Sequence, residues 1–449
     1  MAISTNLGFP RIGARRELKK ALERFWSNRS TADDLATTAR SLRREHWRLQ
    51  KDAGLSHIPS NDFSLYDQVL DAATLCGAVP DRFAALRSGL DRYFAMARGM
   101  AHQGDRPGSA ALEMTKWFDT NYHYLVPELA PGQEFTLGST KPLDEFIEAK
   151  ALGIATRPVL IGPASFLLLS KAREAGGDFD PITLWPRLVP VYEAVLSMLA
   201  SAGAAWVQID EPCLATDDAS RALPHLDAIY SRLAGAAGAT SILLATYFGD
   251  LGEALPTVMN LPVEAVHLDL VRAPEQLWGA LPLVRPDQSL SLGLVGGRNI
   301  WRTDLKRALG IAEASASRLG HDRLMIAPSC SLLHTPFDLD LETTLDPELK
   351  RWMAFARQKL DEVALLARGL TEGWSSIADE LSENEAALRS RRESPRVRSE
   401  AVRRRMAAVT PEQLSRTSPY PTRRVAQRKR TPLPLLPTTT IGSLPQTEA

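Results

Sequence analysis

Short apolar runs rich in β-branched residues alternate with helix-like stretches from about residue 110 onward. The intervening segments, such as residues 184–203 and 303–320, place apolar side chains at helical spacing. Apolar strands that alternate with helices indicate a parallel sheet that is covered on both faces. About eight such units favour an α/β fold, a (βα)₈ TIM-type barrel. The expected strands are residues 157–163, 204–212, 240–248, 264–271, 290–297 and 323–330.

The first 110 residues follow a helical pattern instead, which predicts an N-terminal helical extension. Residues 15–26 carry an apolar stripe, and residues 30–54 begin with a capping signal at Ser30 or Thr31 and stop at Gly54. Near the end of the barrel, residues 345–370 read as one helix. In that helix Asp346 is the expected cap, Pro347 takes the first position, and the inward side chains are Leu349, Met353, Leu360 and Val363.

Composition fits a soluble globular protein, with 44% hydrophobic and 24% charged residues. No apolar run reaches the roughly 18 residues that a transmembrane helix needs, and the N-terminus lacks the features of a secretory signal. The three cysteines are far apart and odd in number, which favours a reducing compartment over a disulfide framework. We therefore expect a cytoplasmic protein that does not contact a membrane.

A net charge of zero conceals an uneven distribution. Residues 389–430 contain 14 Lys and Arg but only 3 Asp and Glu, and the rest of the chain has the opposite excess. Binding to nucleic acid through residues 389–430 is one reading. A solvated basic face is the favoured reading, because aromatic side chains for base stacking are almost absent there.

The carboxyl ends of the expected strands carry the candidate chemistry, because functional groups gather there in a barrel. Adjacent carboxylates at Asp210 and Glu211 are suited to acid–base work, but neighbours on a strand face opposite ways unless the backbone turns. A self-sufficient barrel enzyme built on such residues therefore stays an alternative. The strand-end candidates are Lys116, Asp119, Gly162, Asp210, Glu211, Tyr247, Asp269, Arg298 and Cys330.

Metal and phosphate motifs are weak. No His or Cys pair has zinc-like spacing, and Cys330 with His334 is expected to be packing. The segment "GLVGGRN" matches neither the dinucleotide fingerprint nor the Walker pattern. We predict no metal ligands in this chain.

The segment "FPRIGARRELKKAL" is more promising. Arg15, Arg16, Lys19 and Lys20 crowd the first turn of a predicted helix, where positive charge opposes the helix dipole. Such a turn favours an anionic partner, although a solvated helix face explains the charge pattern equally well.

Several long motifs together resemble the cobalamin-independent methionine synthase family. They include "LGFPRIGARRELKKALERFW", "PSNDFSLYDQVLDAA", "ALEMTKWFDTNYHYLVPEL", "VQIDEPCL", "SLGLVGGRNIWRTDL", "SCSLLHTPFDLDLET" and "LPLLPTTTIGSLPQT". The resemblance runs almost from end to end. It implies a family with two (βα)₈ barrels, in which methyl transfer from 5-methyltetrahydropteroyltri-L-glutamate to homocysteine gives methionine. In the family, zinc in the second barrel binds homocysteine as its thiolate, and the residues of this chain match none of the zinc ligands.

The resemblance also implies roles for particular residues. Arg16, Glu17, Leu18 and Lys19 match the family segment that binds the folate polyglutamate, and Lys116 matches its partner lysine. Ile441, Gly442 and Ser443 match a strand that contacts homocysteine or methionine. Gly296 departs from the pattern, because relatives usually have Asp or Asn there.

From the resemblance we expect three regions: a folate-docking barrel at 1–370, a basic helical linker at 371–435, and the start of a catalytic barrel at 436–449. The chain is then the docking half of the enzyme, as a truncated gene, a fragment, or one part of a split protein with a separate catalytic half. Its expected partner is folate polyglutamate, and the family is typically monomeric. The last residues are expected to be poorly ordered or to lie on the first barrel.

Overall fold

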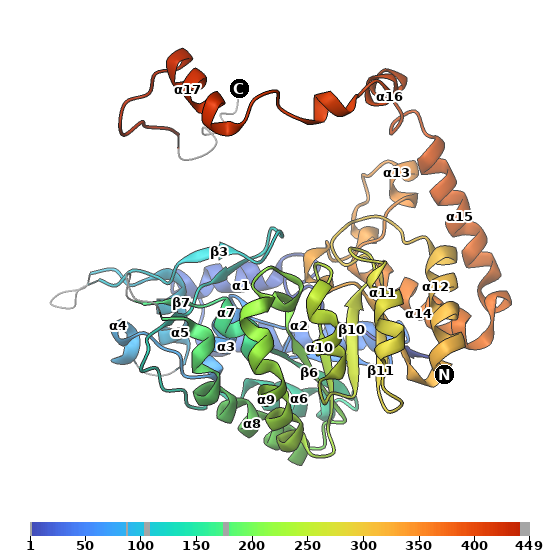
Figure 1. The fold of residues 1–449 in the computed structure, drawn as a ribbon. Helices are drawn as coiled ribbons and strands as arrows, with labels where there is room; N and C mark the ends of the chain where they lie inside the picture. The colour runs from blue at the N-terminus through green and yellow to red at the C-terminus, as the bar shows by residue number, and fades with distance from the viewer. Residues whose placement is uncertain (1, 87–88, 103–107, 174–178, 441–449) are drawn as a thin grey trace. The chain divides into compact units, whose positions relative to one another are not determined.

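An eight-stranded parallel sheet forms the centre of the larger part of the chain. The computed structural model describes residues 2–86, 89–102, 108–173 and 179–440 (Figure 1). Each strand lies beside its neighbours in chain order, as in a barrel. The strands are β1 (Ile3–Ser4), β2 (Ile58–Ser60), β6 (Thr156–Ile161), β8 (Trp206–Asp210), β9 (Ser241–Ala245), β10 (Ala265–Asp269), β11 (Ser289–Val295) and β12 (Leu324–Pro328).

The sheet closes through its first two strands. β1 pairs with β12 on one side, and on the other side Thr5 forms a parallel bridge with His57, directly before β2. The backbone N–H of Asn6 donates to the His57 carbonyl at 3.1 Å. The predicted (βα)₈ fold and its six apolar strands are confirmed. The first two barrel strands lie where the sequence pattern indicated only helices, because two or three residues are too few to show a period.

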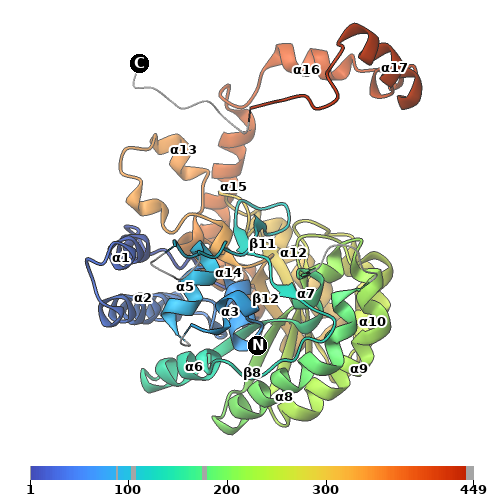
Figure 2. The same cartoon turned by 90° about the vertical axis from the view of Figure 1, so that its left-hand side faces the viewer.

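Helices cover the outside of the sheet, and α8, α9 and α10 lie along its outer face in Figure 2. The two amphipathic segments predicted between strands are confirmed as α8 and α12. None of the helices in the described ranges is long and apolar enough to span a bilayer. The outer helices are α6 (Lys141–Ala151), α7 (Pro163–Leu168), α8 (Trp185–Ser201), α9 (Ala219–Ala237), α10 (Leu255–Asn260), α11 (Gln276–Ala280), α12 (Leu305–Leu319) and α14 (Ala356–Glu372).

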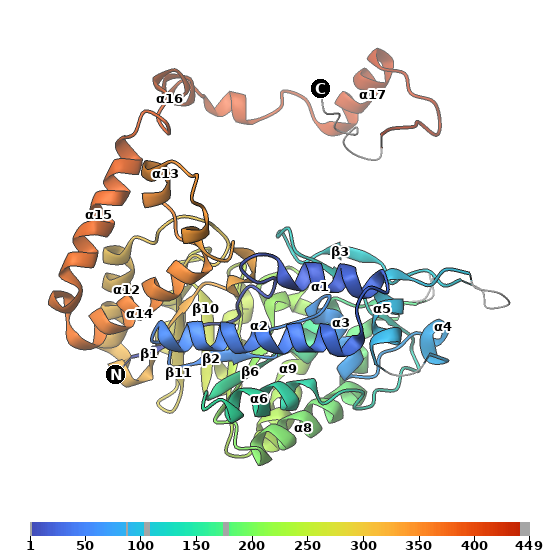
Figure 3. The same ribbon diagram turned by 180° about the vertical axis from the view of Figure 1, so that it is seen from behind.

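The predicted N-terminal helices are α1 (Glu17–Trp26) and α2 (Ala32–Asp52), which come between β1 and β2 in the sequence and lie side by side (Figure 3). Thr31 caps α2 in a reciprocal capping box with Asp34, as the sequence indicated. Both helices contribute to a second, smaller hydrophobic core. Three further helices follow β2, namely α3 (Gln68–Leu75), α4 (Asp81–Ala84) and α5 (Leu90–Arg98).

A separate antiparallel hairpin is formed by β3 (Met114–Lys116) and β4 (His123–Leu125). The sequence pattern predicts Lys116 and Asp119 at a barrel strand end. That placement is wrong, because β3 pairs only with β4 and lies outside the eight-stranded sheet. The other short strands, β5 (Glu128–Leu129) and β7 (Lys171–Ala172), pair with each other.

The predicted helix over residues 345–370 is interrupted. Asp346 caps α13 (Pro347–Arg351) as expected, but the next helix is α14, which begins at Ala356. Between them Met353 bridges Trp301, and the Ala354 N–H donates to the Ile300 carbonyl at 2.9 Å. Pairing with this neighbouring segment replaces helical hydrogen bonds. The helical period alone does not reveal such a partner.

Polar side chains fill part of the barrel interior. The fully buried Arg157 on β6 donates to the Gln208 side chain on β8 at 2.8 Å and to the Asn6 carbonyl at 2.9 Å. His267 on β10 contacts Ser291 Oγ on β11 at 2.9 Å. Gln208, His267 and Ser291 lie inside apolar runs of the sequence, and Arg157 begins one. Because these runs were interpreted as continuous apolar strands, the polar interior was not predicted.

The chain divides into two compact units, Met1–Leu388 and Arg389–Ala449. Helix α15 (Ala378–Glu393) spans the division, and the second unit also contains α16 (Glu400–Ala407) and α17 (Tyr420–Arg430). α16 is exposed along its whole length, and α17 is exposed at every residue except the half-buried Arg423. The functional boundaries expected after residues 370 and 435 stay a prediction.

Candidate functional site

The start of α1 exposes four basic side chains, while Leu18 among them is fully buried. The helix begins at Glu17, so two of the four precede it rather than lying in its first turn. Lys19 forms a solvent-exposed ion pair with Glu23 at 3.6 Å, and the other three basic side chains form no ion pair in the described part of the chain. The four side chains are Arg15, Arg16, Lys19 and Lys20, and Lys19 is the paired one.

A residue with left-handed backbone conformation lies at the start of this helix. Arg16 has φ 61° and precedes the helix without a side-chain cap. The Glu17 carboxylate accepts a hydrogen bond from the Arg15 N–H at 2.9 Å. Gly13 has φ 83°, a backbone conformation that favours glycine, and a Cβ there would also lie 2.9 Å from Leu42 Cδ2. Glu17 thus shapes the backbone of the basic turn.

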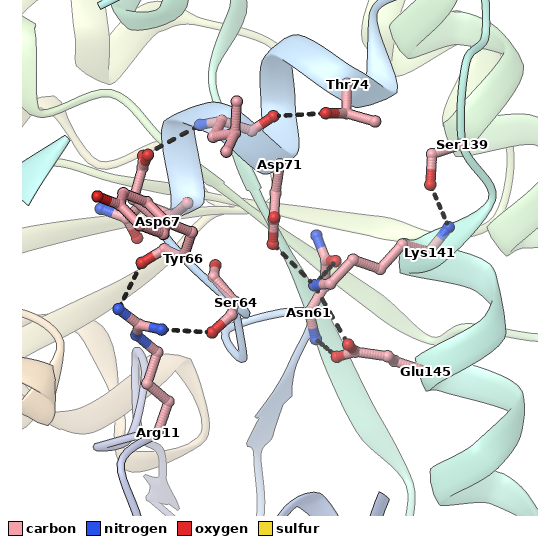
Figure 4. A network of polar contacts seen from close by, with 12 residues as sticks. Arg11, Asn61, Ser64, Tyr66, Asp67, Asp71, Thr74, Ser139, Lys141 and Glu145 are labelled. Atoms are coloured by element: carbon pink, nitrogen blue, oxygen red, sulfur yellow. Dashed lines mark hydrogen bonds and ion pairs between the residues drawn. The ribbon is translucent and has the colours of Figure 1, made fainter. Parts of the chain in front are cut away.

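The segment before the turn is fixed to the loop after β2. Arg11 donates to the Ser64 carbonyl at 2.6 Å and also to the Tyr66 carbonyl (Figure 4). The Phe9 N–H donates to the Asp62 carboxyl at 2.8 Å. Burial raises the pKa of Asp62 to about 6, although this hydrogen bond acts in the opposite direction. These contacts hold the segment that precedes the basic turn against the loop after β2.

Lys116 is exposed at the end of β3 and pairs across the hairpin with His123. The smaller hydrophobic core contains Leu18 and Leu22 of α1 and Leu125 of β4. One packed cluster therefore supports both the helix that carries Lys19 and the hairpin that carries Lys116.

Asp210 is buried inside the barrel and bonded to its neighbours. Its carboxyl accepts from the Gln208 side-chain amide at 2.7 Å and from the Tyr247 hydroxyl at 3.0 Å. Burial raises the pKa of Asp210 to about 7. Through Gln208 it connects to the buried guanidinium of Arg157.

Glu211 lies on the other side of the strand end, as the alternation of side chains along a strand requires. Its carboxyl accepts from the backbone N–H groups of Ala164 and Ser165, at 3.1 and 2.6 Å, and from the Tyr230 hydroxyl at 3.1 Å. Burial raises its pKa to about 7. The structure therefore separates the two adjacent carboxylates instead of directing both at one ligand.

Asp269 also bonds to backbone. It accepts from the N–H groups of Phe248, Val271 and Arg272, at 2.8 to 3.1 Å, and burial raises its pKa. Arg298 forms an ion pair with Asp119 at 2.7 Å. Asp119 belongs to the tip of the β3–β4 hairpin, so the hairpin contacts the carboxyl end of the barrel.

A small cavity of about 40 Å³ lies beside Asp210 at this end of the barrel. Lys141 lines it and is surrounded by acceptors: Asn61 Oδ1 at 2.8 Å, Asp71 at 3.3 Å and Glu145 at 3.2 Å (Figure 4). These partners use the three donors of the ammonium group. The sequence pattern does not reveal this cluster, because β2, which places Asn61, is too short to show a period.

Cys330 and His334 pack as expected. Burial raises the pKa of the Cys330 thiol and lowers that of His334 to about 4, and the His334 ring lies 5.5 Å from the Phe248 ring. Gly297, in the weak phosphate motif, fits against the Cys330 carbonyl, which a Cβ would approach to 2.7 Å. At Gly296, a Cβ would meet the Asn299 side chain at 2.4 Å.

Among the residues that the structure describes, no group of three or more His, Cys, Asp or Glu side chains is placed to hold a metal. These residues therefore offer zinc no suitable donor set. We therefore derive no chemical step through a metal. The predicted amino-acid contacts Ile441, Gly442 and Ser443 lie outside the described residues.

Residues 3–319 match the family described as the N-terminal domain of cobalamin-independent synthase. A 5-methyltetrahydropteroyltriglutamate–homocysteine methyltransferase from Parvibaculum lavamentivorans is 56% identical, and the alignment covers 100% of this chain and 58% of that protein. The enzyme of the same name from Caulobacter vibrioides is 53% identical over 98% of this chain and 58% of its own length. The chain thus spans 58% of the length of each.

Solved structures agree on the fold. A B12-independent methionine synthase from Shewanella sp. W3-18-1 has a TM-score of 0.50 at 12% identity, covering 79% of this chain and 92% of that one. A structural-genomics protein from Listeria monocytogenes has a TM-score of 0.53 at 15% identity, covering 82% and 99%. Identities this low support the fold alone.

Proposed function

We propose, from the premise that this chain belongs to the cobalamin-independent synthase family, that it docks the glutamate tail of a folate methyl donor. The donor is 5-methyltetrahydropteroyltri-L-glutamate, and its methyl group goes to homocysteine to give methionine. The names of relatives that match the whole chain at more than 50% identity support this assignment.

The basic turn at α1 is the observation that carries the proposal. A triglutamate tail presents several carboxylates, and charge-assisted hydrogen bonds from arginine and lysine suit them. Arg16 and Lys19 are exposed at the start of α1, and Lys116 is exposed on the hairpin that shares its core. Glu17 and the buried Leu18 shape and anchor the turn.

The methyl transfer itself needs an activated thiol and a proton for N5 of the folate. The resemblance implies zinc for the thiol, and we assign neither zinc nor the acid to a described residue. The contribution proposed for this chain is to bind and orient the tail. Contacts of Ile441, Gly442 and Ser443 with the amino acid stay a prediction.

The barrel-enzyme alternative receives no support from the strand ends. Asp210, Glu211 and Asp269 are all buried and hydrogen-bonded within the protein. The nucleic-acid alternative concerns the separate unit that carries residues 389–430. It stays a prediction that salt-dependent retention on nucleic acid would test.

Folate binding as a function of tail length tests the proposal. We expect the chain to bind 5-methyltetrahydrofolate with three glutamates more tightly than with one, and the gain to shrink by about threefold to tenfold in Lys19→Ala and Lys116→Ala. Arg318→Ala, which removes an exposed cation on α12, is the matched control and should bind as the parent does. Equal affinity for one and three glutamates would exclude tail docking.

A further inference from the structure

The tip of the β3–β4 hairpin, residues 117–122, is tightly folded. The Trp117 N–H donates to the Tyr122 carbonyl at 2.7 Å, and the Thr120 hydroxyl donates to the Trp117 carbonyl at 2.6 Å. Trp117 is 1% exposed and Thr120 is 6% exposed. Lys116 lies directly before this tip, so the position of the tip determines where the lysine lies.

Asp119 joins the tip to two loops of the barrel. Its carboxylate forms ion pairs with Arg298 at 2.7 Å and with Arg272 at 2.9 Å. Arg298 follows β11 and Arg272 follows β10. The guanidinium of Arg298 also donates to the Asp119 backbone carbonyl at 3.0 Å and lies 4.8 Å from the centre of the Phe248 ring.

Two strained residues meet at the same place. Phe118 has φ 53° and Phe248 has φ 77°, values that bulky side chains rarely adopt. Their rings lie 5.5 Å apart. Backbone strain of this kind persists only where surrounding contacts hold it, and it gathers at functional sites. The contact between hairpin tip and barrel is therefore specific.

Opposite charges gather at this contact. The Arg272 and Arg298 guanidinium groups pair with the exposed Asp119 carboxylate, and the Arg298 charge also acts on the Asp269 carboxyl. Burial opposes the ionised form of Asp119, but the Arg298 hydrogen bond and both guanidinium charges outweigh it and lower its pKa. Asp119 is therefore held in its charged form, which favours both ion pairs.

We propose that Asp119 is a positioning residue for the glutamate-tail site. Its ion pairs with Arg272 and Arg298 hold the hairpin tip against the barrel and so place Lys116 for the tail. The opposite side of the hairpin is held separately, where Asp67 accepts from the Leu125 N–H at 3.2 Å. The inference rests on the proposed function, because it gives Lys116 a tail to bind.

Asp119→Ala in the full chain tests this role. We expect the preference for three glutamates over one to fall by about threefold or more, while the affinity for the monoglutamate stays within about twofold. Asp119→Glu keeps a carboxylate on the hairpin tip and should retain the preference, while Asp119→Asn removes the charge and should lose it as the alanine variant does. Asp227→Ala, an exposed carboxylate on α9, is the matched control.

The outcomes separate the two proposals. If the parent shows no tail preference, the proposed function fails. If Lys116→Ala loses the preference and Asp119→Ala keeps it, the tail site stands and the positioning role is overturned. Loss in Asp119→Ala that Asp119→Glu shows equally also overturns it, because a carboxylate on the hairpin tip would then not be what places Lys116.

Discussion

The adjacent carboxylates of Asp210 and Glu211 have different hydrogen-bond partners, because successive side chains of a strand point to opposite faces. The first belongs to the hydrogen-bonded interior of the barrel, and the second accepts hydrogen bonds from the first turn of α7. Gly162 permits this second arrangement, since a Cβ there would lie 2.1 Å from the Glu211 carboxyl carbon. Both carboxylates thus have structural partners.

Removing Glu211 should therefore cost stability. Glu211→Ala leaves two buried backbone donors and the Tyr230 hydroxyl without their acceptor, and we expect a loss of about 3 kcal/mol in the free energy of unfolding. Glu211→Gln keeps an acceptor oxygen and should lose less. Urea unfolding measures both, with the exposed Glu253→Ala as control. A loss below about 0.5 kcal/mol for the alanine variant would show that the network contributes little.

Charged residues can be located from the sequence more readily than the residues with which they form ion pairs and hydrogen bonds. The basic turn at Arg16 and the opposed directions of Asp210 and Glu211 were both visible, because charge pattern and strand alternation are local. The Asp119 ion pairs join residues more than 150 positions apart, and no local pattern encodes such a contact. Lys141 was missed for the same reason, since two of its acceptors, Asn61 and Asp71, are distant in sequence and only Glu145 lies on the same helix.

At the scale of elements, helices with clear caps were predicted well and very short strands were not. α2 combines the Thr31 capping box with a buried stripe, and the structure reproduces the predicted start within two residues. β1 and β2 contain two and three residues, and their neighbours in the barrel define them. The break between α13 and α14 likewise depends on pairing with residues 300–302, which lies outside any helical pattern.

The capping box supplies a direct test at this scale. Thr31→Ala removes the side chain that accepts from the Asp34 N–H, and we expect it to lower the free energy of unfolding by about 1 kcal/mol. Thr37→Ala, at an exposed position within the same helix, should be neutral or slightly stabilising because alanine favours helices. Equal effects of the two substitutions in urea unfolding would contradict a specific role for the cap.

At the scale of the whole molecule, two sets of buried groups titrate in opposite senses. Burial lowers the pKa of four histidines to about 3 or about 4, namely His46, His57, His267 and His334. Burial raises the pKa of four carboxyls to about 6 or about 7, namely Asp62, Asp67, Asp210 and Glu211. Unfolding near pH 5 to 6 therefore takes up protons at the histidines and releases them at the carboxyls.

These two contributions to the pH dependence of stability have opposite signs. Stability from the neutral histidines is present above their unfolded pKa of 6.5 and is lost as pH falls toward 4. Stability from the protonated carboxyls is present below their unfolded pKa values near 4 and is lost as pH rises toward 7. Because the two contributions oppose each other, we expect the free energy of unfolding to change less between pH 5 and pH 6 than either set alone would make it change.

Replacing one buried carboxyl or one buried histidine should change the pH dependence of stability. Asp210→Asn deletes a carboxyl whose stabilisation fades with rising pH, so its unfolding free energy relative to the parent should rise by about 1.4 kcal/mol from pH 5 to pH 6. His267→Gln should change the slope by a similar amount in the opposite direction. Urea unfolding at the two pH values measures both slopes. Only the change in unfolding free energy between the two pH values is compared, so the packing cost of each substitution, which is the same at both, cancels. Parallel pH profiles for parent and variants would contradict the opposing titrations.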